Sequence, residues 1–260
     1  MNIIMIGDIV GRPGRRIIKE LLPSLVTEFQ IDLVIANGEN AAGGNGITPD
    51  LAEELYEAGI DVLTMGNHVW DKKEILPYFQ LEKRIIRPAN YPPGTPGKGS
   101  IIFPVTRNVK VGIINLSGRV FLDNLECPFR LADALVEDIK HHTPVILVDF
   151  HAEATSEKQA MGWYLDGRVT AVLGTHTHVQ TADERLLPEG TAYITDVGMT
   201  GPRDSVLGVK SEIIIKKFLT HLPTRFEIAS GTAQLNAVVL GVNLANGKAY
   251  SIKRVQRFLD

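Results

Sequence analysis

Short apolar runs alternate regularly with helical patterns in the first half of the chain, and this alternation limits the folds that the chain can adopt. Residues 2–6, 32–36 and 61–65 are apolar runs of strand length. Residues 14–29 carry apolar side chains at helical spacing, which predicts a helix between the first two runs. Residues 48–59 open on Thr-Pro and close on Gly, a typical helix start and stop. This alternation predicts parallel βαβ units.

The pattern changes in the second half of the chain. Two apolar runs on either side of residues 107–108 predict an antiparallel pair, and a helical pattern at 129–141 precedes strands at 144–150 and 170–174. Asn246-Gly247 is typical of a type I′ hairpin turn. Pro23 is expected to kink or split the first helix.

No repeat, low-complexity tract or long linker divides the sequence. We therefore expect residues 1–260 to form a single domain of two sheets, one mostly parallel and one mixed, with helices outside.

Composition excludes several classes of protein. The chain has 260 residues, 44% of them hydrophobic, and a net charge of −3, which excludes wholesale disorder. No apolar run approaches the roughly 18 residues that span a bilayer, and the N-terminal charges follow the apolar stretch, unlike those of a signal peptide. A pI near 6.2 gives no bulk attraction for duplex nucleic acid. A lone cysteine, Cys127, favours a reducing cytoplasm.

Polar side chains that can bind metals or transfer protons follow five of the apolar runs. The eight residues are Asp8, Glu39, Asn40, Asn67, His68, His151, His176 and His178. Because ligands bind beyond the carboxyl ends of strands in α/β sheets, neighbouring strands would bring these side chains to one crevice. Taken singly, each of them is more often a turn former or a hydrogen-bonded boundary residue. Taken together, they predict a metal centre.

The donor types indicate which metals would bind. Carboxylates, amides and imidazoles without a thiolate suit iron, manganese or zinc. The donors are too many for one ion, so we expect two metal ions that share a carboxylate. Such a pair can clamp the attacking and leaving oxygens of a phosphoryl displacement.

Two polar segments near these residues remain open to two interpretations. The basic stretch at 11–16 either attracts an anion at a helix N-terminus or is a solvated face. Arg203, Asp204 and Ser205 follow a Gly/Pro-rich segment and either contact a substrate or form a plain surface loop.

The ordered motifs resemble those of the calcineurin-like metallophosphoesterases. The matching blocks are Gly7-Asp8, Gly38-Glu39-Asn40, Gly66-Asn67-His68, His151 and Gly174-Thr175-His176-Thr177-His178. The longer stretches GDIVGRPGR, ANGENAAGG, GNHVWD, FHAEATSEK, GTHTHVQTAD and MTGPRDSVLG are similar to the bacterial YmdB-type branch of cyclic-nucleotide phosphodiesterases. Together these stretches extend the resemblance through most of the chain.

The resemblance implies an α/β fold, a four-layer α/β/β/α sandwich with two mixed sheets, and a dinuclear centre. Asp8 and His178 would hold the first metal, and Asn67, His151 and His176 the second, with Glu39 bridging. Hydroxide between the metals would attack phosphorus in line while His68 acts as the general acid. The implied substrates are small phosphodiesters, foremost 2′,3′- or 3′,5′-cyclic nucleotides.

The chain departs from the wider family at two positions. Val10 stands where that family has a histidine ligand, and Glu39 stands where it has a bridging aspartate. Asn40 would fill the vacancy at the first metal, as the closer branch implies. Iron or manganese is favoured at this centre, with zinc as the alternative.

Other functions remain open at this point. One enzymatic alternative is a phosphomonoesterase or nucleotidase, and another is a nuclease that acts on RNA ends. A different class is a metal-loaded regulatory or RNA-binding protein with vestigial activity, for which Val10 is the supporting feature. We expect no membrane partner, and a homo-oligomer is compatible with the sequence.

Overall fold

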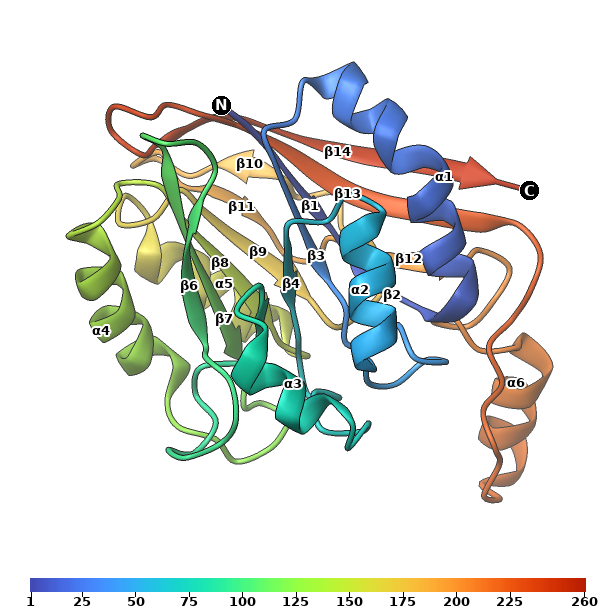
Figure 1. The fold of residues 1–260 in the computed structure, drawn as a ribbon. Helices are drawn as coiled ribbons and strands as arrows, with labels where there is room; N and C mark the ends of the chain where they lie inside the picture. The colour runs from blue at the N-terminus through green and yellow to red at the C-terminus, as the bar shows by residue number, and fades with distance from the viewer.

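Two β-sheets pack face to face in this computed structural model, which describes residues 1–260 (Figure 1). The first sheet contains β1 (Asn2–Ile6), β2 (Asp8–Ile9), β3 (Leu33–Asn37), β4 (Val62–Thr64), β5 (Ile85–Ile86), β12 (Met199–Pro202), β13 (Ala233–Val242) and β14 (Ala249–Leu259). The second contains β6 (Ser100–Pro104), β7 (Lys110–Ser117), β8 (Ile146–His151), β9 (Ala171–Thr175), β10 (Arg185–Leu186) and β11 (Ala192–Ile194). The helices are α1 (Gly11–Phe29), α2 (Pro49–Glu57), α3 (Ile75–Leu81), α4 (Pro128–Lys140), α5 (Thr155–Leu165) and α6 (Ser211–Thr220).

Both sheets mix parallel and antiparallel pairs. The first runs in the order β2-β12-β13-β1-β3-β4-β5, with β14 also paired to β13; β1, β3, β4 and β5 are parallel, whereas β13 is antiparallel to β1 and β14. The second runs in the order β10-β11-β9-β8-β7-β6, in which β7, β8, β9 and β11 are parallel. The predicted fold class with two mixed sheets is therefore confirmed.

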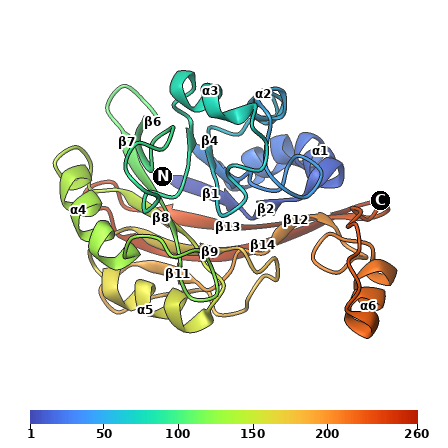
Figure 2. The same ribbon diagram turned by 90° about the horizontal axis from the view of Figure 1, so that it is seen from below.

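Three apolar clusters separate four layers. One joins α1 and α2 to the outer face of the first sheet, for example through Ile17 and Leu55. A second fills the space between the sheets, and a third joins α4 and α5 to the outer face of the second sheet. Successive side chains of a strand point to opposite faces, so Ile35 lies between the sheets while Val34 packs toward the helices. Figure 2 shows the resulting α/β/β/α order.

The structure confirms most of the predicted elements and corrects two details. The helix predicted at 14–29 begins at Gly11 and is not split, because α1 continues through Pro23 to Phe29. The β13–β14 hairpin has no type I′ turn at Asn246-Gly247. That turn needs positive φ at both residues, and only Gly247 has it, at 71°. The chain instead makes a longer loop, in which the Asn243 carbonyl accepts a hydrogen bond from the Gly247 amide.

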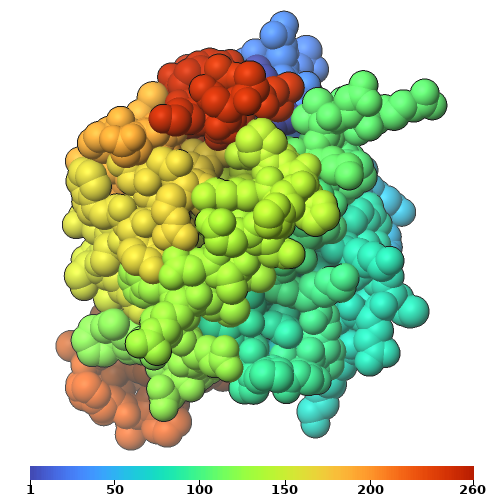
Figure 3. Space-filling model, turned by 90° about the vertical axis from the view of Figure 1, so that its left-hand side faces the viewer, coloured from blue at the N-terminus to red at the C-terminus, as the bar shows by residue number.

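One segment lies apart from the sandwich. The segment that carries α6 projects from the body (Figures 1 and 2). Figure 3 shows it in orange at the opposite end of the molecule from the red β13–β14 hairpin turn. None of the helices is both long and apolar enough to cross a membrane.

Two glycines let backbone segments meet at the strand ends. A Cβ at Gly7 would overlap the carbonyl of Gly198, and a Cβ at Gly174 would overlap the carbonyl of Thr195. Each glycine ends an apolar run and precedes a polar block. Glycine is needed at both positions because only it permits so close a backbone approach.

Candidate metal centre

The carboxyl ends of strands from both sheets bring most of the predicted donors to one place. Asp8 begins β2, directly after β1, whereas Glu39 and Asn40 follow β3 and Asn67 and His68 follow β4. In the second sheet, His151 ends β8, and His176 and His178 follow β9. Parallel strands end at the same edge of a sheet, so donors far apart in sequence converge where the two sheets face each other.

The centre of this cluster is Nε2 of His151, a residue that is fully buried. This atom lies 3.1 Å from Oε1 of Glu39, 3.0 Å from Oδ1 of Asn67 and 3.0 Å from Nδ1 of His176. Donor atoms that surround one ion at about 2.1 Å lie about 3 Å from each other. Each of the three atoms therefore lies at ligand spacing from Nε2 of His151, and ligand atoms of Glu39, His151 and His176 all lie within 4.8 Å of one another, close enough to hold one metal ion.

Asp8 and His178 lie beside this group. Asp8 is fully buried, and its Oδ1 has no hydrogen-bond partner. That oxygen is 3.9 Å from Nδ1 of His151 and 4.0 Å from Nε2 of His178, which is itself oriented by a contact between its Nδ1 and the Leu207 carbonyl oxygen. Oδ1 of Asn40 is also buried without a partner. Buried polar atoms without partners are costly, so these two oxygens fit a cation that binds them.

His68 lies at the rim of the cluster. Its backbone amide donates to Oε2 of Glu39, but its imidazole is 37% exposed, and Nδ1 lies 2.8 Å from Oδ2 of Asp71. A carboxylate bound to Nδ1 orients the ring and leaves Nε2 available for proton transfer. Asp71 was not among the residues predicted from the sequence, although its position three residues after His68 could have identified it.

A second carboxylate that sequence analysis missed lies behind His151. Asp149 is buried in the apolar strand β8, and its Oδ1 accepts a hydrogen bond from the Thr175 hydroxyl. That hydroxyl lies 2.9 Å from Nδ1 of His151. Such outer contacts fix the ring orientation of a histidine ligand. A buried acid within an apolar run was the available signal.

Glu153 supports His176 in the same way. Oε2 of Glu153 lies 3.0 Å from Nε2 of His176, which directs Nδ1 of that ring toward His151. The sequence places Glu153 two residues after His151, but nothing in that spacing identifies its partner, since His176 belongs to another strand end.

The loop that carries His176 and His178 has an unusual backbone. Both histidines have positive φ, 101° and 66°, a conformation that is uncommon outside glycine. The fully buried Asp196 holds this loop, because it accepts hydrogen bonds from the amide and hydroxyl of Thr177. Lys158, also fully buried, donates to Asp196 at 2.6 Å and to the Thr175 carbonyl. This ion pair therefore fixes the loop between the two histidines.

We expect Lys158→Met to destabilise the fold by about 3–5 kcal/mol, because it leaves the Asp196 charge buried without its partner. Urea unfolding would measure the loss. Lys140→Met is the matched control, since Lys140 forms an exposed pair with Glu137. The double variant Lys158→Met/Asp196→Asn should be more stable than Lys158→Met alone. Equal destabilisation of the two lysine variants would contradict the assigned role of the buried pair.

The pKa values of the clustered side chains are shifted in different directions. Burial opposes ionisation of Glu39, but His151 outweighs it and lowers the pKa of Glu39 to about 2. Burial also opposes protonation of His151, yet Glu39 raises the pKa of His151 to about 9. Burial, aided by the charge of His151, lowers the pKa of His176 to about 3. Without metal, a proton on His151 thus partly balances the carboxylates. Burial raises the pKa of Asp8 well above its usual value.

We expect binding of Mn²⁺ to the metal-free protein to release a proton, because Nε2 of His151 must lose its proton before it can bind an ion. Below the pKa of about 9, the apparent affinity should rise about tenfold per pH unit. Calorimetric titration in buffers of different ionisation enthalpy would measure this release. A binding heat that is independent of the buffer would contradict this prediction.

The elevated pKa of His151 also affects the stability of the metal-free fold. It stabilises that fold most below pH 6.5, and this contribution is lost as the pH rises through about 9.

Comparison with known proteins identifies the family of this chain. The family model described as YmdB-like protein matches residues 4–255. The chain belongs to the YmdB-like family. A 2′,3′-cyclic-nucleotide 2′-phosphodiesterase of Bacillus subtilis is 52% identical to it over 255 residues, which are 98% of this chain and 96% of the relative.

Two solved structures of similar proteins have the same fold. A novel phosphatase from Mycoplasma pneumoniae has a TM-score of 0.94 and 38% identity, with 99% of this chain and 93% of that chain covered. A hypothetical protein from Thermus thermophilus has a TM-score of 0.93 and 43% identity, with 99% of each chain covered. Membership of the YmdB-like family confirms the resemblance found in the sequence.

Proposed function

We propose that the chain is a metal-dependent phosphodiesterase that hydrolyses small phosphodiesters, foremost 2′,3′- or 3′,5′-cyclic nucleotides. The observation that carries this proposal is the set of donors around Nε2 of His151, each about 3 Å from it. The names of the relatives support the same class, since they are called phosphodiesterase and phosphatase. We further propose that residues 1–260 act as one metallophosphoesterase domain in the cytoplasm.

The donors divide naturally into two sets. In our proposal Asn67, His151 and His176 hold one metal ion, and Asp8, Asn40 and His178 hold the other. Glu39 would hold both ions. The unpartnered oxygens of Asp8 and Asn40 support the second set. Val10 is a buried apolar residue and cannot bind a metal, so Asn40 supplies the donor that this position lacks.

The donor chemistry favours iron or manganese at this centre, with zinc as the alternative. Oxygen and nitrogen donors without a thiolate suit all three metals. Two amide oxygens are weak donors compared with carboxylates and imidazoles, which favours metals that accept six ligands over tetrahedral zinc.

The proposed reaction needs an activated water, stabilisation of charge on the phosphate and a proton donor, and this arrangement offers a group for each. When bound, the metal ions supply an activated water and stabilise the charge that develops on the phosphate. Glu39, Asp8 and an activated water that has lost a proton would offset three of the four positive charges of two divalent ions, and the single charge that remains suits a phosphodiester monoanion. His68 would donate a proton to the leaving oxygen from Nε2, while Asp71 holds Nδ1 at 2.8 Å.

Elemental analysis followed by substrate profiling tests the proposal. The purified protein should contain two transition-metal ions per chain. After loading with manganese, iron or zinc, it should hydrolyse bis-p-nitrophenyl phosphate faster than the mono-ester and should accept cyclic nucleotides. Preference for the mono-ester would instead assign a phosphomonoesterase. Negligible turnover with full metal content would assign a regulatory or RNA-binding role.

A further inference from the structure

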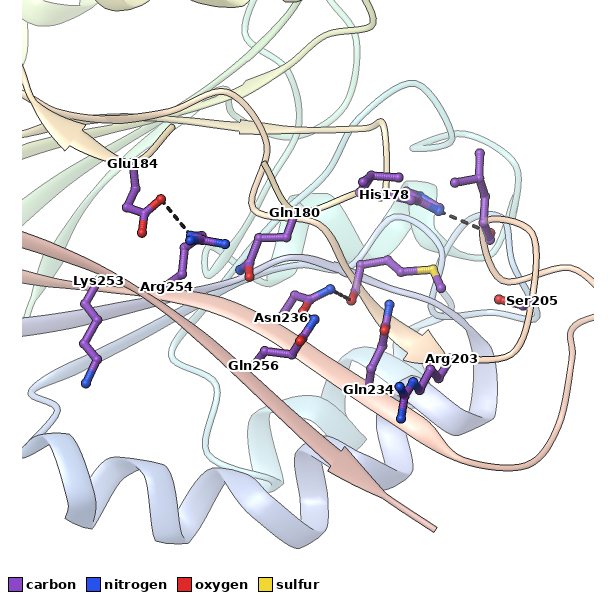
Figure 4. A pocket seen from close by; sticks show the side chains of 13 residues that line it. His178, Gln180, Glu184, Arg203, Ser205, Gln234, Asn236, Lys253, Arg254 and Gln256 are labelled. Carbon is purple, nitrogen blue, oxygen red and sulfur yellow. Dashed lines mark hydrogen bonds and ion pairs between the residues drawn. The ribbon is translucent and has the colours of Figure 1, made fainter. Parts of the chain in front are cut away.

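A polar groove of about 630 Å³ opens beside the proposed metal centre (Figure 4). His178 lines this groove and connects it to the proposed metal centre, because its Nε2 lies 4.0 Å from Oδ1 of Asp8. In Figure 4, Gln180, Asn236 and Gln256 lie in its middle, between the Glu184–Arg254 pair on one side and Arg203 and Ser205 on the other. We refer to this cavity as the amide groove.

The amide groove forms where the inner face of the first sheet changes from apolar to polar side chains along β13. Val238 and Leu240 pack between the two sheets, but Asn236 and Gln234, which continue the same face, are polar. On the neighbouring β14, Gln256 is opposite Asn236 in the register. The apolar core therefore ends at Val238, and amides replace it where the cavity begins.

Several polar groups in the groove have no protein partner. Asn236 is fixed, because its side-chain amide donates to the Met199 carbonyl at 3.0 Å and its Oδ1 accepts from Gln256 at 3.0 Å. The side-chain carbonyl oxygen of Gln256 and the whole side-chain amide of Gln234 make no hydrogen bond within the chain. Amides offer a donor and an acceptor side by side, which matches the edges of nucleobases.

Two positive groups of the groove, Arg203 and Lys253, have no carboxylate partner, but the Lys253 ammonium lies over the Phe29 ring of α1, 5.4 Å from its centroid. Arg254 is neutralised by Glu184 at 2.7 Å, whereas the Arg203 guanidinium has no acidic partner and lies over the Phe258 ring, 4.3 Å from its centroid. A guanidinium held on an aromatic ring keeps its hydrogen-bond donors free for phosphate and its outer face free for a base.

The position of Arg203 separates it from the metal centre. Met199 is opposite Asp8 in the register of β12 and β2. Arg203 follows four residues later, about 13 Å farther along extended chain. The single phosphate of a cyclic mononucleotide, held by the metals, would lie too far away to neutralise Arg203. An anion at Arg203 would be a second phosphate.

We propose that the substrate is the 3′ end of a short single-stranded RNA that carries a 2′,3′-cyclic phosphate. This inference rests on the proposed function. The cyclic phosphate lies at the metal centre, the terminal nucleoside occupies the amide groove, and the phosphate on its 5′ oxygen binds Arg203. In the reaction, water oxygen bonds to phosphorus, the bond from phosphorus to one ribose oxygen breaks, and that oxygen takes up a proton. The product is a linear terminal phosphate.

Kinetics on matched substrates test this assignment. We would compare adenosine 2′,3′-cyclic phosphate with the dinucleotide ApA that ends in the same cyclic phosphate, using the manganese-loaded protein. The dinucleotide should have a kcat/KM about 10- to 100-fold higher, through a lower KM, as expected for a charge-assisted contact. Arg203→Gln should remove this advantage while leaving kcat on the mononucleotide unchanged, and Arg203→Lys should keep part of it.

Arg257→Gln is the matched control. Arg257 follows Gln256 on β14, but it does not line the groove and instead pairs with Glu28 on α1. This variant should keep the full dinucleotide advantage. Equal kcat/KM on the two substrates, or an advantage that survives in Arg203→Gln, would overturn the RNA-end assignment and leave the phosphodiesterase intact. If neither substrate is hydrolysed, the proposed function fails, and this inference fails with it.

Discussion

Glu39→Gln should abolish hydrolysis of cyclic nucleotides, lowering turnover by about 10³-fold or more, and should reduce the bound metal. The substitution keeps the size of the side chain but removes the charge that would neutralise both ions. It also places an amide donor within about 3 Å of Nε2 of His151, where Oε1 of Glu39 now lies. Loss of a shared metal ligand removes several kcal/mol of transition-state stabilisation. Turnover and elemental analysis on the same preparation measure both effects.

The control for this variant is Glu54→Gln, which removes a carboxylate that pairs with Arg15 on the outside of the sandwich. It should retain normal turnover and two metal ions. Near-normal turnover with full metal occupancy in Glu39→Gln would reject the bridging role.

His68→Ala should lower the rate by about 10²–10⁴-fold, the usual contribution of a general acid, while the metal content stays unchanged. Its imidazole lies at the rim, 37% exposed, and contacts Asp71 instead of the central donors. Its removal should therefore spare the ions. The defect should be smaller on bis-p-nitrophenyl phosphate, because p-nitrophenolate leaves without a proton.

Three measurements decide the role of His68: the rate on a cyclic nucleotide, the rate on the activated diester and the metal content. His141→Ala provides the control, since that exposed histidine lies at the end of α4. If His68→Ala loses metal as fully as Glu39→Gln does, His68 is a structural ligand. If both substrates slow equally, it does not act as a proton donor.

Much of the fold and the grouping of most candidate donors at one edge could be predicted because each depends on local pattern. Residues such as Ile35 and Val34 are apolar on both faces of β3, so the run identifies a strand covered on both sides. The polar residue that follows each run marks its carboxyl end, and parallel strands share that edge. The type I′ turn was predicted wrongly because the dipeptide Asn246-Gly247 does not determine the loop length around it.

The order of strands and helices and the candidate metal donors could be predicted from the residues alone, because hydrophobic period and residue type are properties of neighbouring positions. The groups that support those candidates could be identified only from the packing of the two sheets. The contacts of Glu153 with His176 and of Lys158 with Asp196 join separate elements. The amide groove likewise combines β12, β13, β14 and the loop after β9. Contacts between distant segments depend on how sheets pack, and no local spacing encodes that packing.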